Sequence, residues 1–201
     1  MNIVLIGYRG SGKTTLGRKL ADKMWLKFVD TDVLISERAG KTIAEIFATQ
    51  GEPAFRDLES AIIAEVAAGD GQLIALGGGA ILRTQNLAAL KQNGARIVYL
   101  HASTEILAQR IAGDPNTAAT RPPLTSPAGP KSTAQPPAKP GTKNPDKKSP
   151  GGTPGTGSAS LEEIRTVMAI REPLYRAAAD ATLDVTYLNP DDAIYHLTRL
   201  L

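Results

Sequence analysis

The sequence contains no cysteine and only two histidines, and these shortages exclude several kinds of site. Without cysteine there is no disulfide framework, no thiolate zinc site and no cysteine nucleophile, which fits a reducing compartment. His101 and His196 are too few for a histidine-rich metal centre or for a relay of several histidines. Both are expected to be packing or surface residues.

Long hydrophobic runs are also missing. No stretch approaches the ~18 consecutive apolar residues of a membrane-spanning helix, so we expect no membrane partner. The first residues, MNIVLIG, lack a charged region and a long apolar core and predict a strand rather than a secretory signal. We therefore expect a cytoplasmic protein. With 201 residues, 42% of them hydrophobic, the chain can build the core of one domain.

The formal net charge of +3 is unevenly distributed. Residues Pro122–Ser158 contain five lysines, one acidic residue and most of the 14 prolines, whereas the rest of the chain is nearly neutral. Such a segment cannot bury enough apolar area to offset its ordering entropy, so we expect a disordered, low-complexity insertion. Because the basic residues are not organised on a folded surface, we expect no nucleic-acid partner.

Outside this insertion, apolar strand patterns alternate with helical patterns. Strands are expected at 3–6, 28–29, 73–76, 97–100 and 183–185, and helical patterns at 16–24, 42–68, 87–90, 103–111, 160–179 and from Asp191 or Asp192. The continuous apolar runs are typical of strands buried on both faces. Strands joined by helix-length crossovers predict a three-layer α/β fold, with a parallel sheet covered by helices on both faces. We expect one domain over residues 1–201.

The most informative motif is Gly7–Thr14 (GYRGSGKT), which fits the phosphate-loop pattern G-x4-G-K-[ST]. It follows an apolar strand and begins an amphipathic helix. Glycines let consecutive N–H groups point inward, and the helix adds the positive end of its dipole. Lys13 adds a charge for the β- and γ-phosphates, and the Thr14 hydroxyl is a ligand for Mg²⁺. The motif predicts a nucleoside triphosphate site but does not separate kinases from GTPases or motor ATPases.

Four further sets follow the predicted strands or lie on helices: Asp30–Asp32 (DTD), Phe55–Glu59 (FRDLE), Gly77–Gly79, and Arg121-Pro122 later joined by Arg171–Tyr175 (REPLY). In an open α/β sheet, ligands bind beyond the carboxyl ends of the strands. Each set taken alone has a plainer interpretation. The aspartates suit a helix cap, Arg56 and Glu59 a surface ion pair, the glycines a flexible turn, and Arg171 an exposed position.

Together with the phosphate loop, these sets resemble the shikimate kinase family in their order and spacing, from Asn2 to about Leu200 except for the insertion. The resemblance implies a P-loop kinase fold with a five-stranded parallel sheet of order 2-3-1-4-5 and a lid. It also implies transfer of the ATP γ-phosphate to the 3-hydroxyl of shikimate, with Mg²⁺ as cofactor, in aromatic amino-acid synthesis. The expected partners are ATP and shikimate, and the expected state is a monomer.

The resemblance assigns roles to individual residues. Lys13, Asp32 and Arg121 are the expected catalytic residues, with Arg121 as the lid arginine that reaches the transferred phosphoryl group. The ATP-binding residues are Gly10, Ser11, Gly12, Lys13, Thr14, Thr15, Arg110, Arg121 and Pro190, with Arg110 against the adenine. The substrate-binding residues are Asp32, Arg56, Gly77, Gly78, Gly79 and Arg171. The metal ligands are Thr14 and Asp30.

The assigned chemistry agrees with the residue types. Arg56 and Arg171 supply two guanidinium groups for a carboxylate, Asp32 accepts from ring hydroxyls, and the glycine N–H groups can approach the ring closely. The sequence departs from the family after Arg121, where the low-complexity insertion separates it from Arg171 and places the lid in question. The insertion has two interpretations, a neutral spacer and a dedicated binding segment. Alternative functions are a gluconate or nucleoside monophosphate kinase, or a non-catalytic nucleotide-binding module.

Overall fold

The computed structural model of the chain describes residues 1–114 and 160–201. The predicted insertion at 122–158 and the expected lid residue Arg121 lie outside the described residues. Among the residues that are described, no helix is both long enough and apolar enough to cross a membrane.

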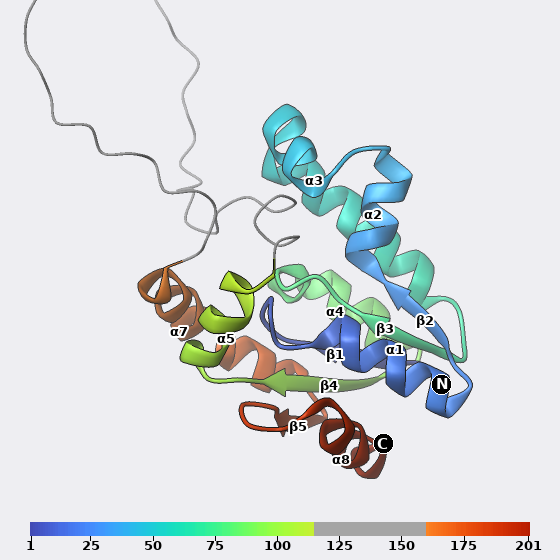
Figure 1. Cartoon of the computed structure of the whole chain (residues 1–201). Helices are drawn as coiled ribbons and strands as arrows, with labels where there is room; N and C mark the ends of the chain where they lie inside the picture. Colours follow the sequence, from blue (N-terminus) through green and yellow to red (C-terminus); the bar gives the residue numbers. More distant parts are fainter. Residues whose placement is uncertain (115–159) are drawn as a thin grey trace, which may run out of the picture.

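Strands and helices alternate along the described part of the chain, as Figure 1 shows. In chain order, the elements are β1 (Ile3–Ile6), α1 (Lys13–Met24), β2 (Lys27–Asp30), α2 (Thr31–Ala39), α3 (Ile43–Ala67), β3 (Gln72–Ala75), the 3₁₀ turn η1 (Ala80–Leu82), α4 (Thr84–Gln92), β4 (Arg96–His101), α5 (Thr104–Ala112), α7 (Leu161–Ala178), β5 (Ala181–Asp184) and α8 (Pro190–Leu200).

The five strands form one parallel sheet in the order β2-β3-β1-β4-β5. The predicted order is therefore confirmed. The register places Val4 of β1 opposite Ile74 of β3 and Ile97 of β4. Because the strands are parallel, their carboxyl ends meet at one edge of the sheet, where the loops after β1, β2 and β3 lie next to one another. That edge carries the motifs singled out in the sequence.

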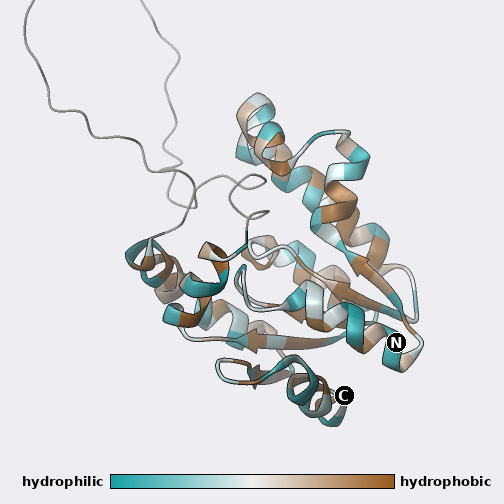
Figure 2. Cartoon of the chain, in the orientation of Figure 1, coloured by the Kyte–Doolittle hydropathy of each residue, from teal (hydrophilic) through white to brown (hydrophobic). Residues whose placement is uncertain are grey.

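Helices cover both faces of the sheet. In Figure 1, α1 and α8 pack together in front of the sheet, and α4 and α7 lie behind it. All four residues of β1 and of β3 are buried, as continuous apolar runs predict for central strands. Figure 2 shows the hydrophobic colour concentrated in these strands and on the inward sides of the helices. The core therefore supports the strand ends from which the functional loops emerge.

Helix boundaries differ from the sequence expectation in three places. Helix α2 was not anticipated, because its start depends on Asp30, whose carboxylate accepts from the N–H of Asp32 and caps the helix. The helical pattern at 42–68 contains a kink at Gly51, whose φ is +81°. Helix α8 begins at Pro190 rather than at Asp191 or Asp192, since the side chain of Asn189 caps it.

Candidate active site

The loop between β1 and α1 has the backbone geometry that a phosphate cradle needs. Gly7, Gly10 and Gly12 have φ values of +144°, +79° and +91°, which L side chains rarely adopt. At Gly7 a Cβ would lie 2.6 Å from the carbonyl oxygen of Leu100, so the loop packs too closely on β4 for a side chain. The loop ends on the N-terminus of α1, where N–H groups and the helix dipole favour an anion.

Lys13 is the first residue of α1 and lies folded over the loop. Its ammonium donates hydrogen bonds to the carbonyl oxygens of Gly7 (2.9 Å) and Tyr8 (2.8 Å). The side chain is only 9% exposed. These bonds hold a positive charge beside the main-chain amides, so the loop and Lys13 together form one site for a polyanion.

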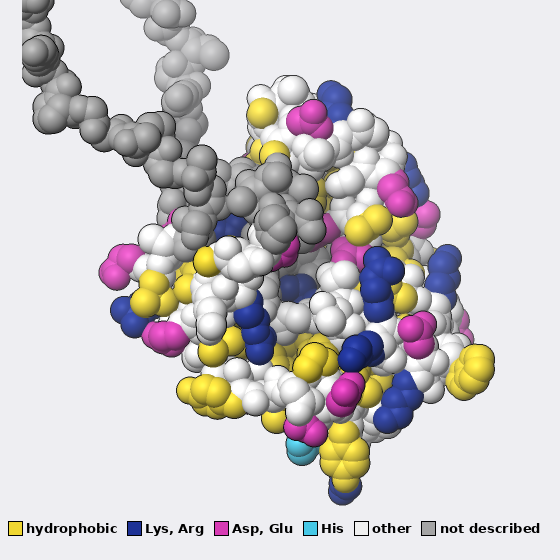
Figure 3. Space-filling model, viewed as in Figure 1, with side chains coloured by type: hydrophobic (Ala, Val, Ile, Leu, Met, Phe, Trp, Pro, Cys, Tyr) yellow, Lys and Arg dark blue, Asp and Glu magenta, His cyan; other side chains and the backbone are white. Residues whose placement is uncertain are grey.

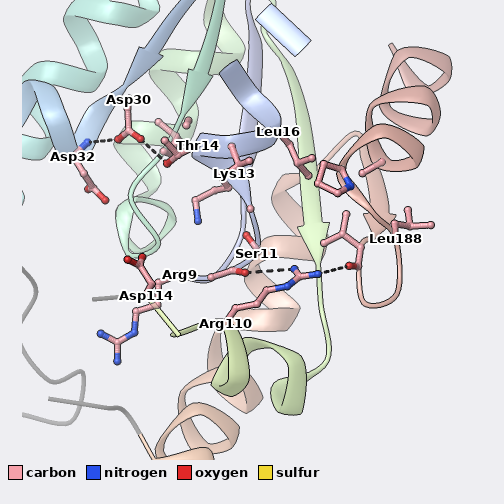
Figure 4. Close-up of a pocket in the computed structure, with 18 residues that line it drawn as sticks. Arg9, Ser11, Lys13, Thr14, Leu16, Asp30, Asp32, Arg110, Asp114 and Leu188 are labelled. Atoms are coloured by element: carbon pink, nitrogen blue, oxygen red, sulfur yellow. Dashed lines mark hydrogen bonds between the residues drawn. The ribbon is translucent and has the colours of Figure 1, made fainter. Parts of the chain in front are cut away.

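The carboxylate of Asp30 connects the start of α1 to the start of α2. One oxygen accepts from the Thr14 hydroxyl at 2.7 Å, and the other accepts from the N–H of Asp32 at 3.1 Å. Figure 4 shows these two bonds as dashed lines at one side of the pocket. The cap interpretation of Asp30 is therefore correct, and the same carboxylate also lies beside the Thr14 hydroxyl.

A pocket of about 580 Å³ extends over the phosphate loop. Figure 3 shows this face of the molecule hollowed near its middle. The pocket brings together every described residue that was expected to bind ATP or metal: Gly10, Ser11, Gly12, Lys13, Thr14, Thr15, Asp30, Arg110 and Pro190.

Arg110 is held at the side of this pocket opposite Asp30 and Asp32 (Figure 4). It donates to the carbonyl oxygens of Val185 (2.9 Å) and Gly10 (3.5 Å), as Figure 4 also shows. Both bonds go to backbone atoms, so α5, the phosphate loop and the segment after β5 are joined here. The guanidinium is thereby fixed as part of the pocket wall.

A second, smaller pocket of about 80 Å³ adjoins the first. It contains every residue that was expected to bind the substrate: Asp32, Arg56, Gly77, Gly78, Gly79 and Arg171. These residues come from α2, α3, the loop after β3 and α7, so segments far apart in the sequence form one cavity. The aromatic rings of Phe47 and Phe55, whose centroids are 4.6 Å apart, complete its wall.

Arg56 and Glu59 form an ion pair inside this smaller pocket rather than on the surface. The guanidinium of Arg56 donates to the Glu59 carboxylate at 2.7 Å, and the two side chains are 12% and 1% exposed. Burial raises the pKa of Glu59, the charge of Arg56 opposes this shift, and the nearby Asp32 carboxylate adds to it. Arg56 also donates from Nε and Nη2 to the carboxylate of Glu52, both at 3.2 Å, so two carboxylates hold its guanidinium in place at the cavity.

The two pockets share a wall made of Asp32 and Arg9, which line both of them. A Cβ on Gly77 would lie 2.6 Å from an oxygen of Asp32, so the glycine turn packs directly against this carboxylate. The pocket over the phosphate loop and the smaller pocket that contains Arg56 and Arg171 therefore meet at Asp32. A group held in one cavity can reach a group held in the other at this point.

Four lining residues with polar or charged side chains were not assigned to the site from the sequence: Tyr8, Arg9, Glu59 and Asp114. Tyr8 and Arg9 lie inside the phosphate-loop motif at positions where its pattern allows any residue, so spacing alone could not select them. Glu59 was noticed only as a helical neighbour of Arg56, and its burial is a tertiary property. Asp114 follows α5 and carries no motif.

The residues beside the phosphate loop fit Mg²⁺, which prefers oxygen ligands. Thr14 and Asp30 supply a hydroxyl and a carboxylate within 2.7 Å of each other. Within residues 1–114 and 160–201, no cluster of three or more histidine or acidic residues could hold a metal by itself. Mg²⁺ commonly takes one or two protein ligands and completes its shell with water and phosphate oxygens.

The sheet order, the glycine-rich loop on the N-terminus of α1 and the adjoining small cavity define a P-loop kinase of the α/β class. Comparison with known proteins identifies the family within this class of kinases. The family model of shikimate kinase matches residues 9–201, and the chain belongs to the shikimate kinase family.

Similar proteins cover nearly the whole chain. The shikimate kinase of Rhodopirellula baltica is 38% identical over 198 residues, which are 98% of this chain and 89% of that protein. The shikimate kinase of Pseudomonas fluorescens is 40% identical over 183 residues, or 91% of this chain and 86% of the relative. Among solved structures, the Acinetobacter baumannii shikimate kinase in complex with shikimate is 31% identical, with a TM-score of 0.76, and the alignment covers 99% of this chain and 91% of that one.

Proposed function

We propose that this chain transfers the γ-phosphate of ATP to the 3-hydroxyl of shikimate, giving ADP and shikimate 3-phosphate. The observation that carries the proposal is the shared wall of the two pockets, where Asp32 faces both the phosphate loop and the cavity of the paired arginines. Membership of the shikimate kinase family supports the choice of acceptor.

On the donor side, the triphosphate is bound by the loop and the first turn of α1. The main-chain amides of Gly10, Ser11 and Gly12 surround the phosphates, and Lys13 carries charge to the β- and γ-oxygens. The adenine lies between Arg110 and Pro190. Thr14 and Asp30 would hold Mg²⁺, and the bound ion would neutralise charge on the phosphate oxygens.

On the acceptor side, the carboxylate of shikimate is bound by the guanidinium groups of Arg56 and Arg171, which offer paired N–H donors. The glycine turn Gly77–Gly79 brings its main-chain amides close to the ring. Asp32 accepts a hydrogen bond from the 3-hydroxyl, directs its oxygen toward the γ-phosphorus and takes its proton as the new P–O bond forms.

Arg121 completes this mechanism as the lid arginine. A guanidinium supplied from the same chain stabilises the charge of the transferred phosphoryl group and can contribute ~10³-fold to turnover. We further propose that the chain acts as a single-domain monomer in the cytoplasm, with ATP and shikimate as its partners and with neither nucleic acid nor membrane.

An ADP-release assay tests the proposal. Purified chain with ATP and Mg²⁺ is mixed separately with shikimate, gluconate and nucleoside monophosphates. Shikimate alone should stimulate ADP release, and mass spectrometry should detect shikimate phosphate. Lys13→Met should lose this activity while its circular dichroism is unchanged, and Lys23→Met, an exposed lysine on the same helix, should keep it. Stimulation by another acceptor, or ATP binding without turnover, would contradict the assignment.

A further inference from the structure

Tyr175 forms a buried contact with the glycine turn of the smaller pocket. Its side chain is fully buried, and its hydroxyl donates a hydrogen bond of 2.5 Å to the carbonyl oxygen of Gly78. A buried carbonyl without a partner is costly, so this bond favours one orientation of the turn over others. The two residues are 97 positions apart in the sequence, and only the fold brings them together.

The ring of Tyr175 is itself held in place by the sheet. It stacks on Tyr99 of β4, with ring centroids 5.1 Å apart and an angle of 16° between the planes. Arg171, which lines the smaller pocket, precedes Tyr175 by one helical turn, so the two side chains lie on the same side of α7. The hydroxyl therefore connects the helix that carries Arg171 to the turn that forms the other side of the cavity.

The glycine turn is packed from both sides. A Cβ on Gly78 would lie 3.5 Å from the carbonyl oxygen of Gly7, 3.6 Å from the N atom of Arg9 and 3.7 Å from the Tyr175 hydroxyl. The turn is thus enclosed between the phosphate loop and α7. A small change in the orientation of this peptide alters the distance between the two substrate pockets.

The bond to Gly78 also sets the direction of the next amide. In a trans peptide the C=O of Gly78 and the N–H of Gly79 point in opposite directions, so fixing the first fixes the second. Across residues 1–114 and 160–201, no hydrogen bond involves the Gly79 N–H, which leaves it available to a ligand. Gly79 also packs closely against the terminal nitrogens of Arg56.

We infer that Tyr175 is a positioning residue for the acceptor: through the Gly78 carbonyl it aims the Gly79 amide into the smaller pocket and holds that turn at a fixed distance from Arg171. It does not contact the phosphate donor or the reacting atoms. The inference rests on the proposed function, since it concerns the shikimate side of the same site.

Tyr175→Phe tests this role because it removes the hydroxyl and keeps the ring. The KM for shikimate should rise about tenfold, and the KM for ATP should change less than about twofold. Tyr99→Phe is the matched control. The stacked Tyr99 hydroxyl is buried and has no hydrogen-bond partner in the described part of the chain, so its removal should leave both KM values unchanged.

A second variant separates positioning from folding. Incorporation of 4-fluorophenylalanine at position 175 fills the space of the hydroxyl but cannot donate, whereas 4-aminophenylalanine keeps a donor at the same ring position. The first should reproduce the tenfold rise and the second should restore a KM for shikimate near that of the wild type. This comparison stands even if Tyr175→Phe fails to fold.

The outcomes are distinguishable. The positioning role would be overturned by an unchanged KM for shikimate in the fluoro variant, or by equal rises in the KM values for shikimate and ATP. In either case, shikimate-dependent ADP release by the wild type would still support the proposed function. Absence of that release in the wild type would instead remove the proposed function, and the inference with it.

Discussion

Gly79 lies so close to Arg56 that a Cβ at this position would be 2.6 Å from both terminal nitrogens of the guanidinium. The contact joins the turn after β3 to α3. The guanidinium is the end of a flexible side chain, so it can move away from a new Cβ at modest cost to folding. It would then leave the position in which it pairs with Glu59. The absence of a side chain at Gly79 therefore allows the Arg56 guanidinium to keep its position in the smaller pocket.

Gly79→Ala should consequently impair the acceptor site more than the fold. We expect the KM for shikimate to rise about tenfold, with a loss of folding stability below about 2 kcal/mol. Steady-state kinetics and urea unfolding measure the two quantities. Gly113→Ala is the control, because Gly113 follows α5 outside the lining of both pockets and its Cβ would meet only atoms at 3.5–3.9 Å. If both variants behaved alike, the displacement of Arg56 would not be the cause.

Asp32→Asn should affect turnover rather than nucleotide binding. An amide can occupy the same space but cannot take a proton from the attacking hydroxyl, so kcat should fall about 100-fold or more. The KM for ATP should change less than about twofold. Asp22→Asn, an exposed position on α1, is the control and should retain wild-type kinetics. A loss of ATP affinity equal to the loss of kcat would argue for a role in nucleotide binding instead.

Arg171→Lys should weaken shikimate binding. An ammonium keeps the charge but loses the paired donors that match a carboxylate, so the KM for shikimate should rise about tenfold, or about 1.4 kcal/mol. Arg165→Lys lies on the same helix in an exposed ion pair with Glu105 and should leave this KM unchanged. Titration calorimetry with shikimate provides an independent check, and unaltered affinity in Arg171→Lys would contradict the assigned role.

Glu59 predicts a specific dependence of stability on pH. Burial raises the pKa of its carboxyl above the ordinary value of 4.5, although Arg56 opposes the shift. In the range between 4.5 and the raised pKa, the folded chain binds more protons than the unfolded chain, so the contribution of Glu59 to stability falls as pH rises.

Urea unfolding of the wild type and of Glu59→Gln, at a series of pH values, measures this effect. The free energy of unfolding of the wild type relative to the variant should decrease as pH increases from 4.5 toward neutrality. A relative stability that increased over that interval would mean that the attraction of Arg56 outweighs the cost of burial and that the pKa is lowered.

Much of the fold could be predicted because it depends on local patterns. Continuous apolar runs identified the central strands, and Gly7–Thr14 identified the phosphate loop with the helix that follows it. Helix α2 was not predicted because its start depends on a cap by Asp30, and Asp30 has equally good uses as a ligand or a turn residue. The kink at Gly51 was missed because a glycine within a helical pattern does not by itself reveal a positive φ.

The candidate site divides in the same way. The motif spacing and the family resemblance together selected Lys13, Asp32, Arg56 and Arg171, and the structure places all four at the two adjoining pockets. They were not enough to select Tyr8 or Arg9, which occupy unrestricted positions of the motif. The sequence also could not show whether the ion pair of Glu59 with Arg56 is buried or on the surface, since burial depends on the elements packed around α3.

The sequence by itself determined the alternating strands and helices and the glycine-rich loop before α1, because these follow from periodicity and from short-range backbone geometry. Its motifs also carried the resemblance to the family. Only the tertiary structure decided that Asp32 belongs to both pockets and that Tyr175 reaches Gly78, since these contacts join segments far apart in the chain. The parallel sheet makes such meetings possible, because it brings the carboxyl ends of its strands to one edge.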